Sequence, residues 1–255
     1  VYFEGDEAML ARANINSRFA ERILIVLDRF KAETFEELFQ AVKALPWAEF
    51  IGSNDTFPVK GYSINSTLHS VPDCQKIIKK AVVESLKEDY NISWFEETGP
   101  IHQIQFSIMK NEVTIMLDTT GRGLHKRGYR KLSSKAPISE TLAAALIMLT
   151  PWKKDRILVD PFCGSGTFPI EAAMMAANMA PGMNREFLSE KWDNIIKKKV
   201  WYDALDEAND LVDLSCETDI QGYDLDPDMV QIARQNAALA GVDGRIHFQQ
   251  REVEK

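Results

Sequence analysis

A string of acidic and small residues is the part of this chain whose residue types could do chemistry. It reads Asp160, Pro161, Phe162, Cys163, Gly164, Ser165, Gly166 and Thr167. The apolar run Ile157–Val159 before it predicts a short buried strand. Apolar residues recur at helical spacing from Ile170 to Ala177, and Pro169 suits a first helical turn, where a missing N–H costs nothing. Strand, glycine loop and helix N-terminus together predict a turn that cradles a nucleotide.

A second acid follows a second predicted strand, Ile220–Asp224, which leads into the predicted helix Met229–Ala240. In a doubly wound fold, a carboxylate at this strand tip accepts hydrogen bonds from ribose hydroxyls, so we expect Asp224 to bind a ribose. The alternative is an acid that only ends its strand. Asp224 lies 64 residues after Asp160 (224 − 160), more than the usual ~20, so segment 178–218 is expected to loop out.

The third strand is predicted at Ile246–Gln249, and Glu252 follows it closely enough to reach an adenine edge. The glycine string is more specific than a loose glycine pair, which many strand–helix turns carry for steric reasons alone. It lacks the Lys-Ser/Thr of a phosphate-binding P-loop and does not match the three-glycine dinucleotide fingerprint. The string is therefore neither of these two nucleotide-binding motifs.

A basic run lies between Asp118 and Glu140, where no acidic residue occurs. Glycines, His125 and Tyr129 interleave with its six fixed positive charges, which are Arg122, Lys126, Arg127, Arg130, Lys131 and Lys135. We expect this run to contact RNA phosphates, with Tyr129 available to stack on a base. The alternative is a solvated linker that happens to be basic.

Composition limits the function classes. The chain has 255 residues, 45% hydrophobic and 27% charged, which is ordinary for a globular protein, and its net charge of −8 means that nucleic acid can be bound only locally. No apolar run approaches the ~20 residues of a membrane span. Cys74, Cys163 and Cys216 are too far apart to suggest a disulfide framework or a zinc site, and the histidines are isolated, so we expect a cytoplasmic protein without a metal.

The first half of the chain predicts an α+β binding or positioning domain. The start, VYFEGD, has no initiator Met and is interpreted as the inside of a strand, so we expect the chain to begin part-way into a domain. Thr34 and Glu37 form a capping-box signature. The predicted strands are Val1–Glu4, Ile23–Leu27, Phe57–Ser66 and the hairpin Ile101–Met109 with Glu112–Asp118. The predicted helices are Ala8–Ala20, Thr34–Leu45, Pro72–Tyr90, Glu140–Thr150 and Trp201–Leu211.

Several strings occur here in an order that resembles a known family. They are the string from Asp160 to Thr167, Asn184-Arg185-Glu186-Phe187, Gly222-Tyr223-Asp224-Leu225-Asp226 and Leu124-His125-Lys126-Arg127-Gly128-Tyr129-Arg130. Together they resemble the bacterial THUMP-domain RNA methyltransferases that use S-adenosylmethionine, close to the large-subunit ribosomal RNA guanine-N2 methyltransferases. Such proteins are often labelled adenine-specific DNA methylases.

The resemblance implies an α/β Rossmann-like methyltransferase domain, of which this chain holds the first half, preceded by an α+β ferredoxin-like and THUMP region. Residues 1–31 would be the remainder of the ferredoxin-like domain, 32–120 the THUMP RNA-binding domain, and 121–255 the basic linker and first half of the methyltransferase domain. The family's Asn-Pro-Pro-Tyr-type motif is expected beyond Lys255, so we assign no catalytic residue.

The resemblance also implies the cofactor, the substrate and the site. S-adenosylmethionine would donate a methyl group to a base exocyclic amine, guanine N2 of 23S ribosomal RNA, with RNA as the partner. Asp160 would hold the methionyl ammonium, Asp224 the ribose hydroxyls and Glu252 the adenine amine, and Leu225 would also bind the cofactor. The residues that would wrap the methionine and ribose are Phe162, Cys163, Gly164, Ser165, Gly166 and Thr167. The residues that would contact RNA phosphates are Arg122, Lys126, Arg127, Arg130 and Lys135.

Three alternatives stay open at this point. A transfer RNA guanine-N2 methyltransferase or a DNA adenine methylase would share the glycine string. A protein of a different class, a non-catalytic RNA-binding protein with a vestigial methyltransferase fold, would keep the same front half. The sequence leaves the target nucleotide and the oligomeric state undecided.

Overall fold

The computed structural model describes residues 1–130 and 137–253, so Lys131 and Lys135 of the basic run lie outside the described residues. By their internal contacts the residues form two compact units, each built from separate stretches of chain. The first unit comprises Val1–Glu21, Arg122–Glu186 and Lys199–Lys255; the second comprises Arg22–Gly121 and Phe187–Lys198. Among the described residues, no helix combines the length and the apolar character that crossing a membrane requires.

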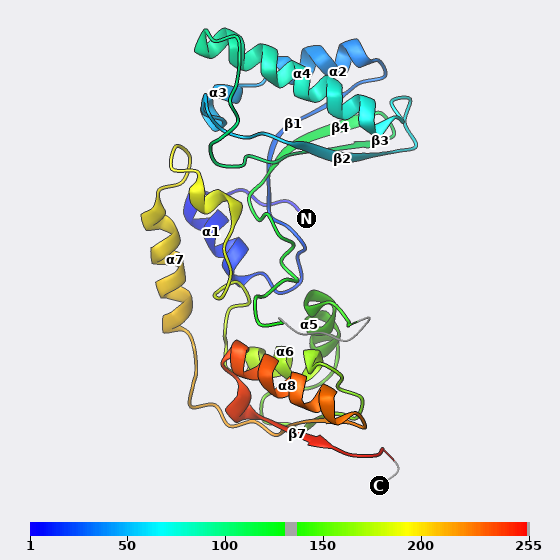
Figure 1. Cartoon of the computed structure of the whole chain (residues 1–255), viewed down its shortest axis with the longest axis vertical. Coiled ribbons are helices and arrows are strands. Elements are labelled where there is room, and N and C mark those ends of the chain that lie inside the picture. The colour runs from blue at the N-terminus through cyan, green and yellow to red at the C-terminus, as the bar shows by residue number, and fades with distance from the viewer. Residues whose placement is uncertain (131–136, 254–255) are drawn as a thin grey trace. The chain divides into compact units, whose positions relative to one another are not determined.

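The second unit is a four-stranded sheet with helices on one face (Figure 1). The sheet order is β1-β4-β3-β2, with β2 parallel to β3 and the other neighbours antiparallel. Its strands are β1 (Leu24–Lys31), β2 (Val59–Ile64), β3 (Ile104–Met109) and β4 (Glu112–Asp118). Its helices are α2 (Phe35–Lys43), α3 (Trp47–Phe50) and α4 (Val71–Tyr90). Strand β1 pairs with β4 in this sheet, although its residues precede the predicted domain boundary at 31/32.

Alternation of apolar residues explains the core of the second unit. Inward residues of β3 and β4, such as Phe106 and Ile115, are buried against helix residues such as Leu38 and Ile78. The predicted capping box at the start of α2 is confirmed: Glu37 N–H donates to Thr34 Oγ1 at 3.2 Å, and Thr34 N–H donates to Glu37 Oε2 at 3.2 Å.

A short stretch from much later in the chain completes this core. It contains the 3₁₀ helix η1 (Leu188–Lys191) and then Trp192, which is fully buried. The Trp192 indole N–H donates to the carbonyl of Ile101 at 2.9 Å, and its ring stacks on buried His102 with 4.5 Å between ring centroids. The segment after the glycine string therefore belongs by packing to the second unit.

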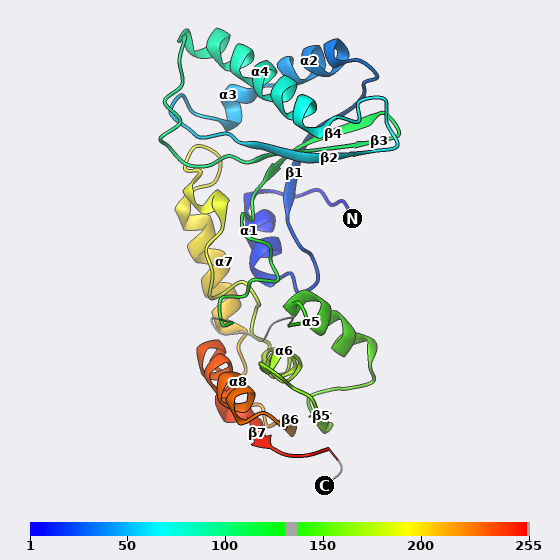
Figure 2. The ribbon, with the colours of Figure 1, turned by 45° about the vertical axis from the view of Figure 1, so that its right-hand side comes forward.

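The first unit carries the glycine string on a three-stranded parallel sheet of order β5-β6-β7, with α6 and α8 packed against it (Figure 2). The strands are β5 (Leu158–Asp160), β6 (Ile220–Asp224) and β7 (Ile246–Gln250). The helices are α1 (Glu7–Asn16), α5 (Glu140–Leu149), α6 (Thr167–Ala176), α7 (Lys198–Asp210), α8 (Pro227–Ala240) and the 3₁₀ turn η2 (Asp243–Arg245). Register pairs Asp160 with Gly222, so the carboxyl ends of β5 and β6 meet at one edge.

The element predictions are confirmed for most of the chain and wrong at its start. Residues Val1–Glu4 form no strand and are exposed. Their residue types favour a strand, but a strand needs a partner for its backbone, and no described strand pairs with them. The first helix is also shorter than predicted, because it ends at Asn16, where the backbone of Ser17 turns extended, although it begins one residue early, after the N-cap Asp6.

Candidate functional site

The loop between β5 and α6 takes a conformation that glycine adopts most readily. Gly164 and Gly166 both have left-handed backbone, with φ of +52° and +86°. A Cβ on Gly166 would lie 3.0 Å from Ala233 Cβ and 3.1 Å from Phe248 Cζ, so the loop packs closely on α8 and β7. At Gly164 nothing lies within 4 Å of the same position, which leaves the loop open to a ligand on that side.

The two predicted acids bracket this loop. Asp224 Oδ2 accepts from the Gly164 N–H at 2.9 Å, and Asp224 Oδ1 accepts from the Asp226 N–H at 3.0 Å. Asp160 Oδ1 accepts from the Phe162 N–H at 3.1 Å. Burial raises the pKa of Asp160, and the nearby Asp224 raises it further, against the opposing effect of the Phe162 N–H. Two carboxylates at one sheet edge can hold a cation and accept hydroxyl hydrogen bonds.

Most of the loop presents backbone instead of side chains. Cys163, Ser165 and Thr167 are buried, and the carbonyl of Ser165 accepts from Asn236 Nδ2 at 3.0 Å. The exceptions are Phe162 and Leu225, whose relative exposures of 74% and 64% leave an apolar side chain on each strand tip facing solvent. The structure therefore brings the predicted cofactor residues Asp160, the loop, Asp224 and Leu225 into one place. For a ligand, however, the loop offers mainly backbone atoms, because the side chains of Cys163, Ser165 and Thr167 are buried.

Glu252 follows the end of β7 by two residues and is exposed. Its segment is tied to β6, because the Arg251 N–H donates to the carbonyl of Asp224 at 3.0 Å and Gln250 Nε2 donates to the carbonyl of Leu225 at 3.0 Å. These bonds keep the third strand end beside the second. The assignment of Glu252 to an adenine edge stays a prediction.

The thiol in the loop is expected to be unreactive. Burial raises the pKa of Cys163 to about 12, with Asp160 and Asp224 adding to the effect. Only roughly one thiol in ten thousand would then be ionised at pH 8. Treating the folded protein with iodoacetamide should label the more exposed Cys216 at least about tenfold faster than Cys163. Peptide mass spectrometry measures this, and equal labelling would show that the loop opens in solution.

Part of the basic run is wrongly assigned to RNA by the sequence. Arg127 is only 2% exposed, and its guanidinium Nε lies 3.5 Å from Glu171 Oε1 on α6. The same guanidinium donates to the carbonyls of Leu124 at 2.9 Å and Arg18 at 2.6 Å. Tyr129 is buried too, and its hydroxyl donates to Glu171 Oε1 at 3.0 Å. Neither side chain can reach a phosphate or a base, because both are buried and hydrogen-bonded inside the first unit.

Arg130 also turns inward. Its side chain is 8% exposed, and Nε lies 3.3 Å from Glu140 Oε1. Arg130 is therefore corrected as well, from a phosphate contact to an internal ion pair. Arg122 and Lys126 are exposed, as an RNA contact requires, while Lys135 lies outside the described residues. The signal that could have revealed the inward turn is Glu171, an acid on an otherwise apolar helix, since a buried carboxylate needs a buried partner.

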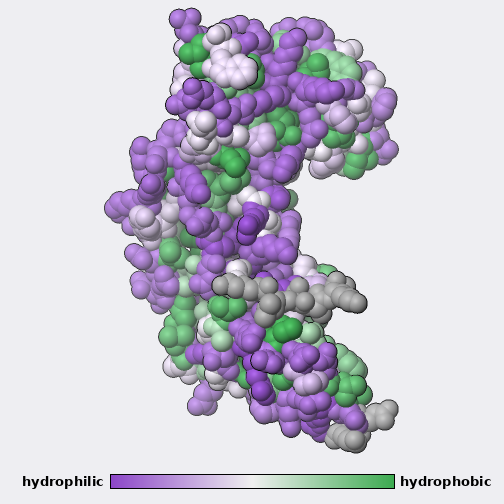
Figure 3. All heavy atoms as spheres, viewed as in Figure 1, coloured by the Kyte–Doolittle hydropathy of each residue, from purple (hydrophilic) through white to green (hydrophobic). Residues whose placement is uncertain are grey.

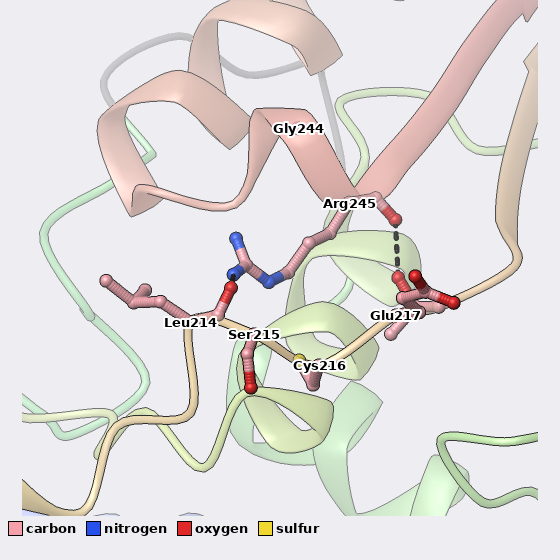
Figure 4. A pocket seen from close by; sticks show the side chains of 7 residues that line it. Leu214, Ser215, Cys216, Glu217, Gly244 and Arg245 are labelled. Carbon is pink, nitrogen blue, oxygen red and sulfur yellow. Dashed lines mark hydrogen bonds between the residues drawn. The ribbon is translucent and has the colours of Figure 1, made fainter.

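Two surface hollows lie in the first unit, and the second of them borders the start of the loop. One, of about 490 Å³, lies at the amino ends of β6 and β7 (Figure 4), where Thr218 Oγ1 donates to the carbonyl of Arg245 at 2.9 Å and the Arg245 guanidinium donates to that of Leu214. The other, of about 390 Å³, is mainly apolar and lies beside β5, with Trp152 and Val159 in its wall and Asp160 at its end. Hydrophobic side chains reach the surface among hydrophilic ones in this unit (Figure 3).

No group of three or more potential metal-binding His, Cys, Asp or Glu side chains is gathered within residues 1–130 and 137–253. The polar atoms at the loop are thus two carboxylates and backbone groups. Such a set suits an organic ligand with a cation and a diol.

Residues 127–255, half of the chain, match the family model described as the RMKL-like methyltransferase domain. The chain belongs to this methyltransferase family. In the same chain, residues 32–118 match the THUMP domain and residues 1–24 match the RlmL ferredoxin-like domain. The family resemblance drawn from the sequence and the fold class expected from it are confirmed.

Two curated relatives of this RMKL-like chain differ in length. It is 49% identical over 255 residues to the Bacillus subtilis (strain 168) protein named "Putative RNA methyltransferase YpsC", a match that covers 99% of this chain and 66% of the relative. It is 33% identical over 257 residues to "Ribosomal RNA large subunit methyltransferase K/L" of Buchnera aphidicola subsp. Schizaphis graminum, covering 97% of this chain and 36% of that protein. The chain thus spans about two thirds of the first relative and about a third of the second.

Solved structures share the whole fold of the RMKL-like chain. A Listeria monocytogenes str. 4b F2365 protein, described in its crystal structure as a predicted N6-adenine-specific DNA methylase, superimposes with a TM-score of 0.95 at 52% identity, covering 99% of this chain and 67% of that one. The structure described as "SMU.472, a putative methyltransferase complexed with SAH" gives a TM-score of 0.93 at 41% identity, covering 98% of this chain and 67% of that one.

Proposed function

We propose that this protein is an RNA methyltransferase that binds S-adenosylmethionine in the loop between β5 and α6. The observation that carries the proposal is the pair of strand-tip acids, Asp160 and Asp224, on either side of a loop that is open at Gly164. The SAH bound to the related SMU.472 structure supports the same ligand class. The protein would then be cytoplasmic, in keeping with its ribosomal RNA substrate. We also propose the domain boundaries 31/32 and 120/121, which the matches of residues 1–24, 32–118 and 127–255 to separate family models support, although β1, just before the first boundary, pairs with β4.

The residues present fit this donor. Its methionyl part carries an ammonium, which suits a carboxylate such as Asp160 that has only one hydrogen bond from the described residues. Its ribose diol suits Asp224, since each carboxylate oxygen accepts one backbone N–H and retains a second lone pair. The exposed side chains of Phe162 and Leu225 offer apolar surface to the remaining adenosine.

The bound donor would supply an electrophilic methyl group on a sulfonium. The contribution of this chain is to orient the donor, because Asp224 fixes the loop through the Gly164 N–H while accepting from the ribose. Asp160 would neutralise the ammonium. Orientation of this kind converts a bimolecular encounter into a reaction within one complex, which can lower the activation free energy by several kcal/mol.

For the acceptor we propose a base exocyclic amine, guanine N2 of 23S ribosomal RNA. The THUMP match and the names of the two curated relatives support RNA, and the second of these names supports the large ribosomal subunit. Exposed Arg122 and Lys126 would contact phosphates. The experiment is mass spectrometry of nucleosides from the ribosomal RNA of cells that lack the protein. Loss of N2-methylguanosine from 23S RNA supports the proposal, and an unchanged nucleoside profile contradicts it.

One observation favours a second candidate, a DNA adenine methylase, because the Listeria structure carries that description. A methyl-transfer assay with ribosomal RNA, transfer RNA and unmethylated DNA, each at equal nucleotide concentration, separates the candidates. Incorporation into DNA alone would replace our proposal.

The pKa of Asp160 predicts how donor binding depends on pH. An ammonium binds the ionised carboxylate, and burial raises the pKa of Asp160 above its ordinary value. Donor affinity should therefore fall as the pH is lowered through that raised pKa. The effect of Asp160 on folding has the opposite sign: because its pKa is higher in the folded than in the unfolded protein, its contribution to stability is lost as the pH rises. Calorimetric titration with S-adenosylhomocysteine between roughly pH 4 and 7 measures this. Asp160→Asn should bind more weakly and lose the dependence; the same dependence in both proteins would remove Asp160 from the ammonium site.

A further inference from the structure

A buried arginine connects the loop with the segment that precedes it. Arg130 Nη2 donates to Thr167 Oγ1 at 3.0 Å and to the carbonyl of Ile138 at 2.8 Å. Its Nε lies 3.3 Å from Glu140 Oε1, and the side chains of Arg130 and Glu140 are both nearly fully buried. A guanidinium with this many fixed contacts holds a single orientation.

The atom that it holds belongs to the donor loop. Thr167 is the first residue of α6 and directly follows Gly166, whose left-handed backbone sets the direction of the loop. Gly166 N–H donates to the carbonyl of Cys163 at 2.8 Å, and Ile170 N–H donates to that of Gly166 at 3.0 Å. Because α6 has no side-chain cap at its N-terminus, the Thr167 hydroxyl is a point where another residue can fix this turn.

A neighbouring arginine makes the comparison that isolates this contact. Arg127, three residues earlier, contacts the same helix one turn further on, at Glu171, and among the described residues it makes no hydrogen bond or ion pair to the loop. The two arginines are thus both buried and both paired with a carboxylate, while Arg130 alone reaches Thr167. If donor affinity falls only because the core is disturbed, it should fall when either arginine is replaced.

We propose that Arg130 is a positioning residue for the methyl donor: by holding the Thr167 hydroxyl, and being held itself by Glu140, it fixes the loop in the conformation that binds the donor. This inference rests on the proposed function. It assigns Arg130, a buried residue of the basic run, a role in binding the donor instead of RNA. Arg130 acts through Thr167 and does not itself need to touch the ligand.

The test is calorimetric titration of the protein with S-adenosylhomocysteine. Arg130→Gln is expected to weaken binding about five- to tenfold, because a charge-assisted buried hydrogen bond is lost and its free energy is only partly transmitted to the loop. Thr167→Val, which removes the hydroxyl at nearly constant shape, should cause a loss of the same size. Thr167→Ser keeps the acceptor atom and should lose clearly less affinity than Thr167→Val. In the Arg130→Gln background, Thr167→Val should add nothing.

Arg127→Gln is the matched control, measured at a temperature where thermal denaturation shows it folded. It should lower the melting temperature yet bind S-adenosylhomocysteine as the wild type does. The inference is overturned if Arg130→Gln binds normally, if Arg127→Gln loses as much affinity, or if the two losses add in the double variant. Should Arg130→Gln fail to fold, equal affinities of Thr167→Val and Thr167→Ser overturn it. A wild-type protein that binds no donor contradicts the proposed function instead.

Discussion

Replacing Asp224 with alanine is expected to weaken binding of S-adenosylhomocysteine by more than about tenfold. The variant would lose the bonds to the ribose, the bond from the Gly164 N–H that shapes the loop, and the bond from the Asp226 N–H that shapes the turn after β6. A hydrogen bond to a charged group contributes about 1.5–3 kcal/mol, and a tenfold change in affinity needs about 1.4 kcal/mol. Isothermal titration calorimetry at neutral pH is the measurement.

Asp219→Ala is the control for this result, because Asp219 immediately precedes β6 at its other end and its carboxylate accepts only a local bond from Gln221 Nε2 at 2.7 Å. It should bind the donor as the wild type does. If Asp224→Ala binds the donor nearly as well as the wild type does, the ribose is not bound at this strand tip. Equal losses of affinity in both variants would point to a general effect of charge.

The second large effect is on stability. Arg127→Ala should lower the free energy of unfolding of the first unit by about 3–5 kcal/mol, since removing one partner of a buried pair leaves the other charge uncompensated. That partner is Glu171, whose pKa burial already raises above its ordinary value. The Tyr129 hydroxyl and the nearby charge of Arg18 would remain beside it and compensate it only in part. The carbonyls of Leu124 and Arg18 would also lose a donor. Urea unfolding followed by circular dichroism gives the measurement.

Lys126→Ala is the neighbouring control. Lys126 is exposed, so its removal should leave the urea midpoint nearly unchanged. If Arg127→Ala unfolds at the wild-type midpoint, the buried position of Arg127 in solution is contradicted, and its assignment to RNA phosphates becomes tenable again.

The loop could be predicted from the sequence because its demands are local. Left-handed backbone at Gly164 and Gly166 favours glycine, a strand tip needs a short apolar run, and a parallel pair brings the tips of β5 and β6 to one edge. Residue type therefore located Asp160 and Asp224 and the turn between them. It could not tell that Ser165 and Thr167 face inward, because that depends on how α8 and Arg130 pack against the loop.

The basic run shows why the rest could not be predicted. A row of arginines and lysines has the same sequence pattern whether its charges face solvent or buried carboxylates, and the partners here, Glu140 and Glu171, come later in the chain. The same limit applies to Trp192, whose place beside His102 depends on a contact across some ninety residues. Patterns of period two or 3.6 report which face is apolar and not which distant side chain covers it.

The path of the backbone has a consequence for anyone who wishes to excise either unit. It passes from one unit to the other at 21/22, 121/122, 186/187 and 198/199, so neither is encoded by an uninterrupted stretch. A fragment cut near residues 32–120, where sequence patterns place a boundary, would omit both β1 and Trp192 and leave their apolar neighbours uncovered. During translation, likewise, the THUMP sheet must wait for the segment 187–198 to leave the ribosome before its core can close.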